Sequence, residues 1–401
     1  MTAPDEVTVG VATSLSAVPA ADWDACALGP QNGSDETHNP FVSHAFLSSL
    51  EEAGCVGGRS GWAPAHLTAS DPDGRVAAAA PCYLKSHSMG EYVFDGGWAD
   101  AYERAGGRYY PKLQVSVPFT PVTGPRLMVR AGAAATARST LVAGLDALRG
   151  QAGASSTHLT FLDETEARAL EADGYLVRTD QQFHWLNEGY RTFDDFLDAL
   201  ASRKRKSIRR ERRDALSSGI IVDWVTGRDI TEAHWDAFFA FYMETGSRKW
   251  GRPYLNRRFF SLIGERMADR VLLVMARRNG RLIAGAINFI GDAALYGRNW
   301  GCLEHHPFLH FEVCYYQAIA FAIERGLKRV EAGAQGEHKL ARGYRPVATW
   351  SAHRIADPGF RRAVADYLKR ERQYVELARE EYEAAGPFRQ SGALTAPEVD
   401  E

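Results

Sequence analysis

Several features that identify common protein classes are missing from this sequence. Its five cysteines are scattered without a CxxC pair, which argues against a disulfide framework and against a zinc ribbon. No apolar run reaches the 18 or so residues of a transmembrane helix, and the start, MTAPDE, lacks the basic and apolar segments of a secretory signal. We therefore expect a cytoplasmic protein with no membrane span.

Signatures of the common enzyme classes are missing as well. The sequence has no GxxxxGK[ST] phosphate loop, no GxSxG elbow, no HExxH zinc motif and no GxGxxG dinucleotide fingerprint. His310 and Glu312 form an HxE pair, but the PCxxC partner of the zinc deaminases is absent. We therefore expect neither a metal site nor a permanently bound cofactor.

Charge is divided unevenly along the chain. No lysine or arginine precedes Arg59, and residues 1–185 hold 12 basic against 21 acidic residues. Residues 186–401 reverse the balance, with 35 basic against 29 acidic residues. This asymmetry predicts two units with different surfaces, and an anionic ligand for the second unit.

Two segments of the chain resemble each other. Residues 67–84 (LTASDPDGRVAAAAPCYL) align without gaps with residues 273–290 (LVMARRNGRLIAGAINFI). Each is typical of two strands joined by a tight turn, at Asp73-Gly74 and Asn279-Gly280, because these residues adopt a left-handed backbone readily. The alternative is chance similarity between two common hairpins.

Similar elements around both hairpins favour duplication. Apolar spacing predicts helices over 42–50, 139–149, 234–245, 257–267, 308–325 and 360–385, and strands over 158–162 and 329–332. We therefore predict an α/β fold with a mixed sheet and two tandem units. The units span residues 1–185 and 186–385, and a frayed tail follows over 386–401.

The second unit opens with a strongly basic segment. Eight of the eleven residues from Arg203 to Arg213 are basic, and they follow an amphipathic helix start over 193–200. One interpretation is a phosphate-facing surface for a nucleotide, a coenzyme or tRNA. The other is a solvated helix whose charges pair with acidic groups of the first unit.

Two polar segments of the second unit are candidates for chemistry. In the first, Arg298, Asn299 and Trp300 are followed by His310 and Glu312 at a strand-to-helix junction, where free backbone N–H groups bind anions. The alternative is that each histidine is a helix cap or a packed side chain.

The second candidate is a glycine-rich loop after the strand at 329–332. It contains Gln335, Glu337, His338, Lys339 and Arg342. Loops at strand ends commonly carry functional residues, although a solvated turn has the same composition. We expect this loop to lie beside the 296–312 junction.

The first unit holds one comparable segment. Tyr109, Tyr110, Lys112 and Gln114 lie among further aromatic residues and prolines. This composition suits the wall of a groove for an extended ligand, or else a rigid loop in the core.

Four stretches resemble one family. They are 39–43 (NPFVS), 90–95 (GEYVFD), 109–113 (YYPKL) and 338–343 (HKLARG). With the duplicated element order, the chain resembles tandem GNAT-fold proteins, and in particular the Fem-like predicted N-acyltransferases described as peptidoglycan biosynthesis or recognition proteins. The resemblance covers most of residues 39–355.

The resemblance implies roles for some residues. The basic segment is similar to the Arg/Lys-rich helix of Fem-type enzymes, and Lys339 with Gly343 is similar to their FKxxFG motif near the donor or acceptor groove. The GNAT pyrophosphate motif Q/R-x-x-G-x-G/A is half present: Arg298 and Gly301 fit, but Leu303 takes the third position. The long helical hairpin of Fem ligases is missing.

The resemblance implies an N-acyltransferase that moves an acyl or aminoacyl group from an activated donor to a small-molecule or peptide amine by direct attack. Acyl-CoA is the expected co-substrate. His310, Glu312 and Glu337 are the candidate bases, with Lys339 and Arg342 holding donor phosphate or the developing oxyanion. The remaining candidates for substrate contact are Tyr109, Tyr110, Lys112, Gln114, Arg298, Asn299, Trp300, Gln335 and His338. Two alternatives remain: aminoacyl-tRNA-dependent transfer with tRNA on the basic segment, and a non-catalytic module that binds a cell-wall fragment or a protein.

Overall fold

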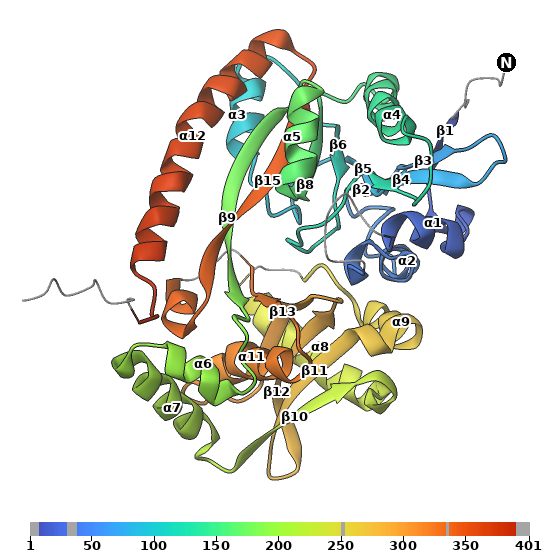
Figure 1. Cartoon of the computed structure of the whole chain (residues 1–401). Helices are drawn as coiled ribbons and strands as arrows, with labels where there is room; N and C mark the ends of the chain where they lie inside the picture. The colour runs from blue at the N-terminus through green and yellow to red at the C-terminus, as the bar shows by residue number, and fades with distance from the viewer. Residues whose placement is uncertain (1–7, 30–37, 250–252, 334–336, 390–401) are drawn as a thin grey trace, which may run out of the picture.

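The computed structural model describes residues 8–29, 38–249, 253–333 and 337–389. Within these residues, eleven strands form one long mixed sheet (Figure 1). In spatial order they are β10 (Ile220–Thr226), β11 (Val271–Arg278), β12 (Arg281–Ile290), β13 (Ala294–Cys302), β14 (Arg329–Glu331), β9 (Leu176–Leu186), β15 (Arg345–Ile355), β8 (Ser156–Leu162), β6 (Lys112–Val115), β5 (Cys82–Lys85) and β2 (Trp62–Pro64).

The sheet has nearly the same plan when read from either end. Strands β13 and β14 form a parallel pair in the second half, and β6 and β8 form a parallel pair in the first half. Antiparallel strands flank each parallel pair on both sides. Strands β9 and β15 pair with each other at the centre of the sheet. This repeated strand order supports the duplication inferred from the sequence.

Both predicted hairpins are present, but they lie in different sheets. Strands β11 and β12 turn at Asn279 and Gly280, both with positive φ, inside the long sheet. The first hairpin joins β3 (His66–Ser70) to β4 (Val76–Ala80) in a small sheet that also holds β1 (Thr8–Ala12) and β7 (Met128–Val129). Pro81 then separates β4 from β5, because proline cannot donate a hydrogen bond to a ladder.

Helices cover both sheets, and those predicted from apolar spacing are confirmed. They are α2 (His44–Glu52), α4 (Ala137–Gln151), α8 (Glu232–Lys249), α9 (Arg257–Met267), α12 (Pro358–Ala384), and a run of α10 (Leu309–Phe311), a π-turn (Glu312–Tyr316) and α11 (Gln317–Glu324). The others are α1 (Ala20–Ala27), α3 (Gly96–Arg104), α5 (Glu164–Ala172), α6 (Phe193–Ala199) and α7 (Ser202–Leu216).

The two halves share one hydrophobic core. Helix α2 packs against α9, and the rings of Phe41 and Phe46 meet Phe259 and Phe289 with centroids 4.8–5.6 Å apart. Edge-to-face ring pairs of this kind add to the free energy gained by burying apolar area. The interface therefore holds the halves in a fixed relation.

The halves also exchange strands. Strand β9 of the first half pairs with β14 of the second, while β15 of the second pairs with β8 of the first. Helix α12 crosses β9 and β15, as its place along the long sheet in Figure 1 shows. The predicted boundary near residue 186 falls at the end of β9, inside the continuous sheet.

The predicted tail begins with residues that contact the second half. The backbone N–H of Ala201 donates to the Pro387 carbonyl, and that of Arg389 donates to Ala199. The ring of Phe388 packs on Arg345, 4.3 Å from its guanidinium. Among the described residues, no helix has the length and apolar character needed to cross a bilayer.

Candidate functional site

The central feature of the second half is the place where β13 and β14 separate. Their parallel pairing covers three positions and ends at Tyr296 and Glu331. Strand β13 continues to Cys302, whereas β14 stops. A cavity of about 260 Å³ opens at this point, and Gly297 and Ala332 line it on either side of the gap.

A bulge in β13 shapes this cavity. Asn288 of β12 pairs with Gly297, but Ala286 pairs with Trp300, so β13 carries one extra residue at Arg298–Asn299. A bulge of this kind redirects side chains and leaves backbone groups outside the ladder. Arg298, Asn299 and Trp300, all predicted site residues, line the cavity.

Helices close the cavity from both faces of the sheet. Helix α8 contributes Tyr242, Thr245 and Gly246. It packs closely on β13 at Gly301, where a Cβ would lie 2.0 Å from the Phe241 carbonyl oxygen. From the other side come His310, Cys314 and Tyr315. The last two lie in the π-turn, a local widening that is frequent at functional sites.

The cavity is lined by polar groups without protein partners. Within the described part of the chain, no hydrogen-bond partner exists for Thr245 Oγ1, Asn288 Nδ2, or Nε and Nη2 of Arg298. All four atoms are buried and belong to residues that line this cavity. Buried polar groups in folded proteins are nearly always paired, so a group of orphans around one cavity indicates a place for a bound molecule.

His310 is the predicted base that reaches the cavity. Its ring packs on Trp300, with centroids 4.9 Å apart, and lies 5.5 Å from the ring of Tyr315. The Tyr315 hydroxyl is 3.0 Å from Nε2 of the exposed His338. Cavity-lining groups are thereby connected to a side chain in contact with solvent.

Glu312 lies elsewhere, although it is only two residues from His310. Its side chain is fully buried under α7, where Nε and Nη2 of Arg212 donate to the two carboxylate oxygens at 3.0–3.3 Å. Gln317 Nε2 donates to it at 2.7 Å. With these partners Glu312 fixes the π-turn against α7 and does not line the cavity.

Lys339 and Arg342 hold the chain segment that follows β14. The ammonium of Lys339 donates to the carbonyls of Ala332 and Gly333, the latter at 3.1 Å, and burial lowers its pKa to about 8. The guanidinium of Arg342 lies 3.4 Å from the ring centroid of Phe311 and donates to Glu211 at 2.8 Å. Both therefore hold the chain beyond β14.

Two predicted residues of this loop cannot be placed. Gln335 lies outside the described residues, and so does the side chain of Glu337. The described end of the loop approaches the 296–312 junction as expected, since the ring centroid of His338 lies 6.3 Å from that of His310 and 5.7 Å from that of Phe311.

The half-matched pyrophosphate motif does not form a helix start. Arg298 and Gly301 both lie within β13, and the helix begins at Leu309 after a separate loop. Arg298 instead lies between the halves, with its guanidinium 4.7 Å from the ring centroid of Phe41 and 5.4 Å from that of Tyr296. Burial lowers its pKa to about 10, against the opposing effect of Glu331.

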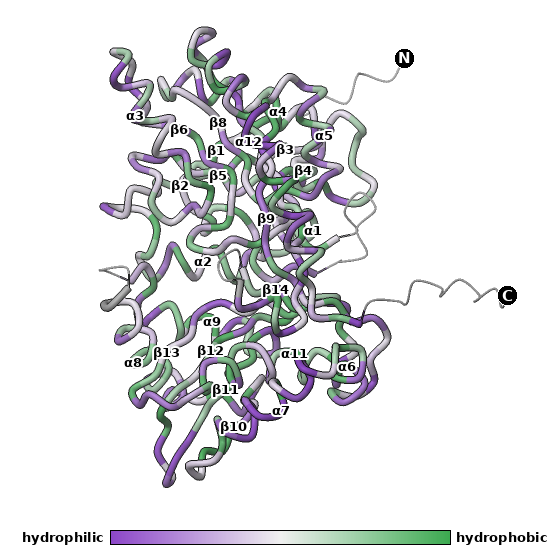
Figure 2. The backbone as a smooth tube through the Cα atoms, turned by 90° about the vertical axis from the view of Figure 1, so that its left-hand side faces the viewer, coloured by the Kyte–Doolittle hydropathy of each residue, from purple (hydrophilic) through white to green (hydrophobic). Residues whose placement is uncertain are grey.

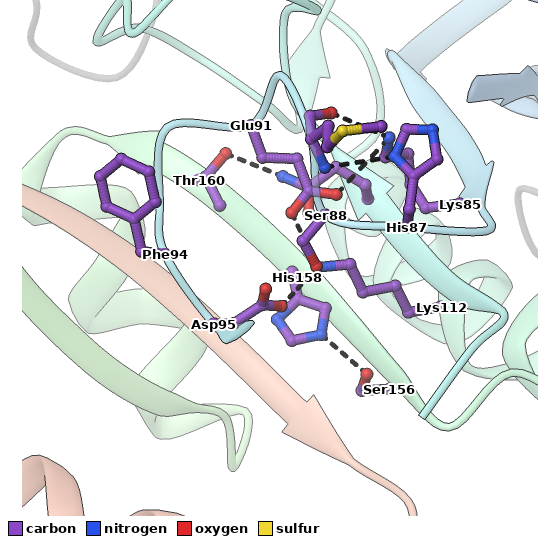
Figure 3. A network of polar contacts seen from close by, with 12 residues as sticks. Lys85, His87, Ser88, Glu91, Phe94, Asp95, Lys112, Ser156, His158 and Thr160 are labelled. Carbon is purple, nitrogen blue, oxygen red and sulfur yellow. Dashed lines mark hydrogen bonds and ion pairs between the residues drawn. The ribbon is translucent and has the colours of Figure 1, made fainter. Parts of the chain in front are cut away.

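The predicted residues of the first half belong to a buried polar network, and Figure 3 shows Lys112 within it, beside Ser88, Glu91 and Asp95. The ammonium of Lys112 donates to Glu91 at 2.7 Å, to Ser88 at 2.8 Å and to Asp95. The Tyr109 hydroxyl donates to Asp95 at 2.6 Å, Tyr110 bonds Ser88, and Gln114 donates to Thr160. Lys112, Tyr109 and Gln114 are fully buried, so these residues lie in the core and not along a groove.

The basic helix α7 forms a hydrophilic edge of the second half (Figure 2). Several of its arginines pair with acidic side chains: Arg205 with Asp198, Arg209 with Asp194 and Arg212 with Glu312. Those partners belong to the second half, not to the first as the alternative interpretation supposed. Arg209, Arg210 and Arg213 still have more than half of their side chains exposed.

Sequence reasoning missed several cavity residues. Tyr242, Thr245 and Gly246 lie on a helix that was identified only by its apolar spacing. Asn288 gave a usable signal, because it is a polar residue inside an otherwise apolar strand. Among the described residues, no cluster of three or more histidine, cysteine, aspartate or glutamate side chains could hold a metal ion.

Comparison with known proteins identifies relatives of this fold. A family model described as FemAB-like, peptidoglycan biosynthesis/recognition, matches residues 14–390. The structure is similar to FemX, with 12% identity and a TM-score of 0.52, over 87% of this chain and 98% of that one. It is also similar to a conserved protein of unknown function from Bacteroides thetaiotaomicron, with 11% identity and a TM-score of 0.50, over 87% of this chain and 100% of that one.

A tandem GNAT protein from the clavulanic acid biosynthesis pathway also matches, with 12% identity and a TM-score of 0.47, over 88% of this chain and 99% of that one. None of the curated protein sequences matches this chain significantly. The mixed sheet of an α/β fold with two tandem units, as predicted from the sequence, is confirmed.

Proposed function

Because this chain belongs to the FemAB-like family, we propose that it is an N-acyltransferase whose reaction takes place in the cavity between β13 and β14. The family is one of acyl- and aminoacyltransferases with a GNAT fold. The observation that carries the proposal is the open gap between the two parallel strands, lined by buried polar atoms without partners.

The geometry supports direct attack of an amine on the donor carbonyl. The amine must be neutral, and His310 is the group at the cavity that can accept its proton. As the new C–N bond forms, the C–S bond of an acyl thioester breaks and the thiolate leaves, so the proton taken up by His310 passes to that thiolate or to water. No covalent enzyme intermediate is required in this scheme.

The carbonyl oxygen gains negative charge in the transition state. The backbone at the Arg298–Asn299 bulge and the amide of Asn288 are donors at the cavity that could stabilise it. Donors fixed in a buried site are effective because they need no reorganisation during the reaction. We therefore assign β12 and β13 the oxyanion side of the cavity, and α10 with the π-turn the base side.

The donor is proposed to be an acyl-CoA, as the GNAT resemblance implies. Thermal unfolding should be measured with acetyl-CoA, with longer acyl-CoAs and with free CoA. A donor at about 100 times its Kd adds about 2.7 kcal/mol to the free energy of unfolding, which gives a clear shift. No shift with any of them would remove acyl-CoA as the donor.

A second candidate donor is aminoacyl-tRNA, and the exposed arginines of α7 favour it. Contacts to phosphates release counterions, so tRNA binding would weaken steeply as salt rises. Reversing two charges, R209E with R210E, should then weaken binding, while R168E on α5, at the far end of the molecule from α7 in Figure 1, should not. Filter binding without salt dependence would exclude this donor. Affinity for a muropeptide without any donor binding would instead favour the non-catalytic alternative.

A further inference from the structure

Residues 86–95 of the first half carry Tyr92, whose hydroxyl interacts electrostatically with two residues that line the cavity. Figure 3 shows Glu91 and Asp95 turned from this segment toward Lys112, at the start of β6. Lys112 bonds both carboxylates, and Lys85 lies 3.7 Å from Glu91. Lys85 and Lys112 are fully buried. The segment is therefore fastened at two points on either side of Tyr92.

Tyr92 has an unusual conformation and position. Its φ of 61° lies in the left-handed region, which an aromatic residue adopts only when its surroundings impose it. The residue is 38% exposed, yet burial of its hydroxyl end raises the pKa of Tyr92. That hydroxyl interacts electrostatically with Tyr254, Tyr242 and Arg298, of which the last two line the cavity.

The segment is also joined to the wall between the halves. The N–H of Phe119 donates to the Gly90 carbonyl at 3.1 Å, and the Phe119 ring stacks on Tyr254 at 4.8 Å. A second, smaller cavity lies here, lined by Phe41, Phe119 and Phe259 and, like the first, by Arg298 and Asn299. Arg298 thus forms part of the partition between the two cavities.

Other arginines of the same chain indicate what the unpartnered edge of Arg298 is suited to bind. Arg178 uses Nε and Nη2 to hold the two oxygens of Glu371 at 2.8 and 2.6 Å. Arg212 uses the same two atoms on Glu312. In Arg298 only Nη1 is engaged, by the Gly297 carbonyl at 2.9 Å, and no partner for Nε or Nη2 exists in the described residues.

We infer that Arg298, with the hydroxyls of Tyr92 and Tyr242, binds a carboxylate group carried by the amine acceptor. A guanidinium edge matches a carboxylate with two parallel hydrogen bonds, and the phenols are neutral donors beside it. The acceptor would then be an amino acid or a peptide with a nearby carboxylate, and not a simple amine. This inference rests on the proposed function and names its acceptor class.

A singly charged carboxylate fits better than a phosphate of the donor. Glu331 is buried nearby; burial alone would raise its pKa, but His184, Arg329 and Arg298 together hold it below the ordinary value, so it is ionised. One guanidinium beside an ionised glutamate has little charge left to balance a doubly charged group. Arg298 also lies within β13, away from the start of α10, where the donor phosphates are expected.

The test uses two amines that differ only in the carboxylate, L-lysine and 1,5-diaminopentane. Transfer from acetyl-CoA is compared for wild type, R298Q, R298K and Y92F, with R277Q on β11 as the control. In the wild type, kcat/KM should be at least about tenfold higher for L-lysine. R298Q should bring the ratio near one, R298K should restore part of it, and Y92F should lower it about threefold, while R277Q leaves it unchanged.

Two further measurements separate this inference from the donor assignment. Calorimetric titration without donor should detect L-lysine binding to the wild type and none of 1,5-diaminopentane, whichever donor the enzyme uses. The CoA-induced thermal shift should be the same in R298Q and Y92F as in the wild type. Equal treatment of the two amines in the titration would overturn the inference, and so would loss of the CoA shift in R298Q, which would assign the guanidinium to donor phosphate.

Discussion

The long sheet contains two parallel strand pairs with the same kind of neighbouring strands. The chain fills the space beside one pair, whereas a cavity lies beside the other. Beside β6 and β8, the chain that leaves β6 returns along the end of β8: the N–H of Gly124 donates to Phe161, and the fully buried Arg126 donates to the carbonyls of Thr160 and Val122. Beside β13 and β14, a cavity of about 260 Å³ occupies the gap between the strands.

The buried cations at the two places differ in the same way. Lys112 in the first half bonds two carboxylates and Arg126 bonds carbonyl oxygens, although Glu91, Asp95 and Gln114 each keep one buried oxygen without a partner in the described residues. Arg298 in the second half carries buried Nε and Nη2 atoms for which the described residues supply no partner. A paired buried charge stabilises a fold, whereas an unpaired one is retained at a cost that ligand binding can offset. This difference supports the proposal that the reaction takes place in the second half.

The largest expected effect is on activity in the second half. Replacing His310 with glutamine should lower kcat by about 100-fold or more, since a positioned base contributes 10²–10⁴-fold. The melting temperature should change little. Steady-state kinetics with the donor found by thermal shift would check this, with H234Q near the start of α8 as the control. If H310Q kept full activity, His310 would not be the base.

The matching change in the first half should affect stability. Replacing Lys112 with methionine leaves Glu91 and Asp95 buried without their main cation, so the free energy of unfolding should fall by about 3–5 kcal/mol. Urea denaturation measures this directly. A change below about 1 kcal/mol would remove the contrast between the halves.

Acid should destabilise the fold through a histidine pair that joins β8 of the first half to β15 of the second. His158 and His353 face each other with Nδ1 atoms 2.7 Å apart; burial, then Lys112, lowers the pKa of His158 to about 3, and burial lowers that of His353 as well. Because both pKa values are depressed in the folded state, the stability they contribute is complete above pH 6.5 and is lost as pH falls toward 3. H353Q should reduce the loss between pH 6 and 5 by about 1.4 kcal/mol per pH unit. An unchanged slope would show that the pair is already charged.

A smaller effect is expected at Glu312, which the sequence made a candidate base. E312Q removes the charge that Arg212 holds and should lower the free energy of unfolding by about 1–2 kcal/mol. The kcat should remain within about threefold of the wild type. A hundredfold loss of kcat without a loss of stability would instead indicate that Glu312 acts as a base.

Much of the fold could be predicted from the sequence, because apolar periodicity and tight turns are local properties. The strand exchange of β9 and β15 could not, since it depends on pairing between residues more than 150 positions apart. For the site, polar residues at strand ends led to Arg298, Trp300 and His310. The same reasoning selected Lys112 and Glu312, because a sequence does not show whether a polar group has a buried partner. Tyr242 and Thr245 were missed because only the apolar spacing of their helix was considered.

The most direct test of the contrast between the halves is the stability of R298M measured beside K112M. Methionine removes a buried guanidinium whose Nε and Nη2 have no hydrogen-bond partner in the described residues, and Glu331 keeps its ion pair with Arg329, so the free energy of unfolding of R298M should stay within about 1 kcal/mol of the wild type or rise. K112M should fall by several kcal/mol in the same urea titration. A comparable loss in R298M would contradict the account, because it would show that Arg298 is held by a partner within the fold and is not kept for a ligand.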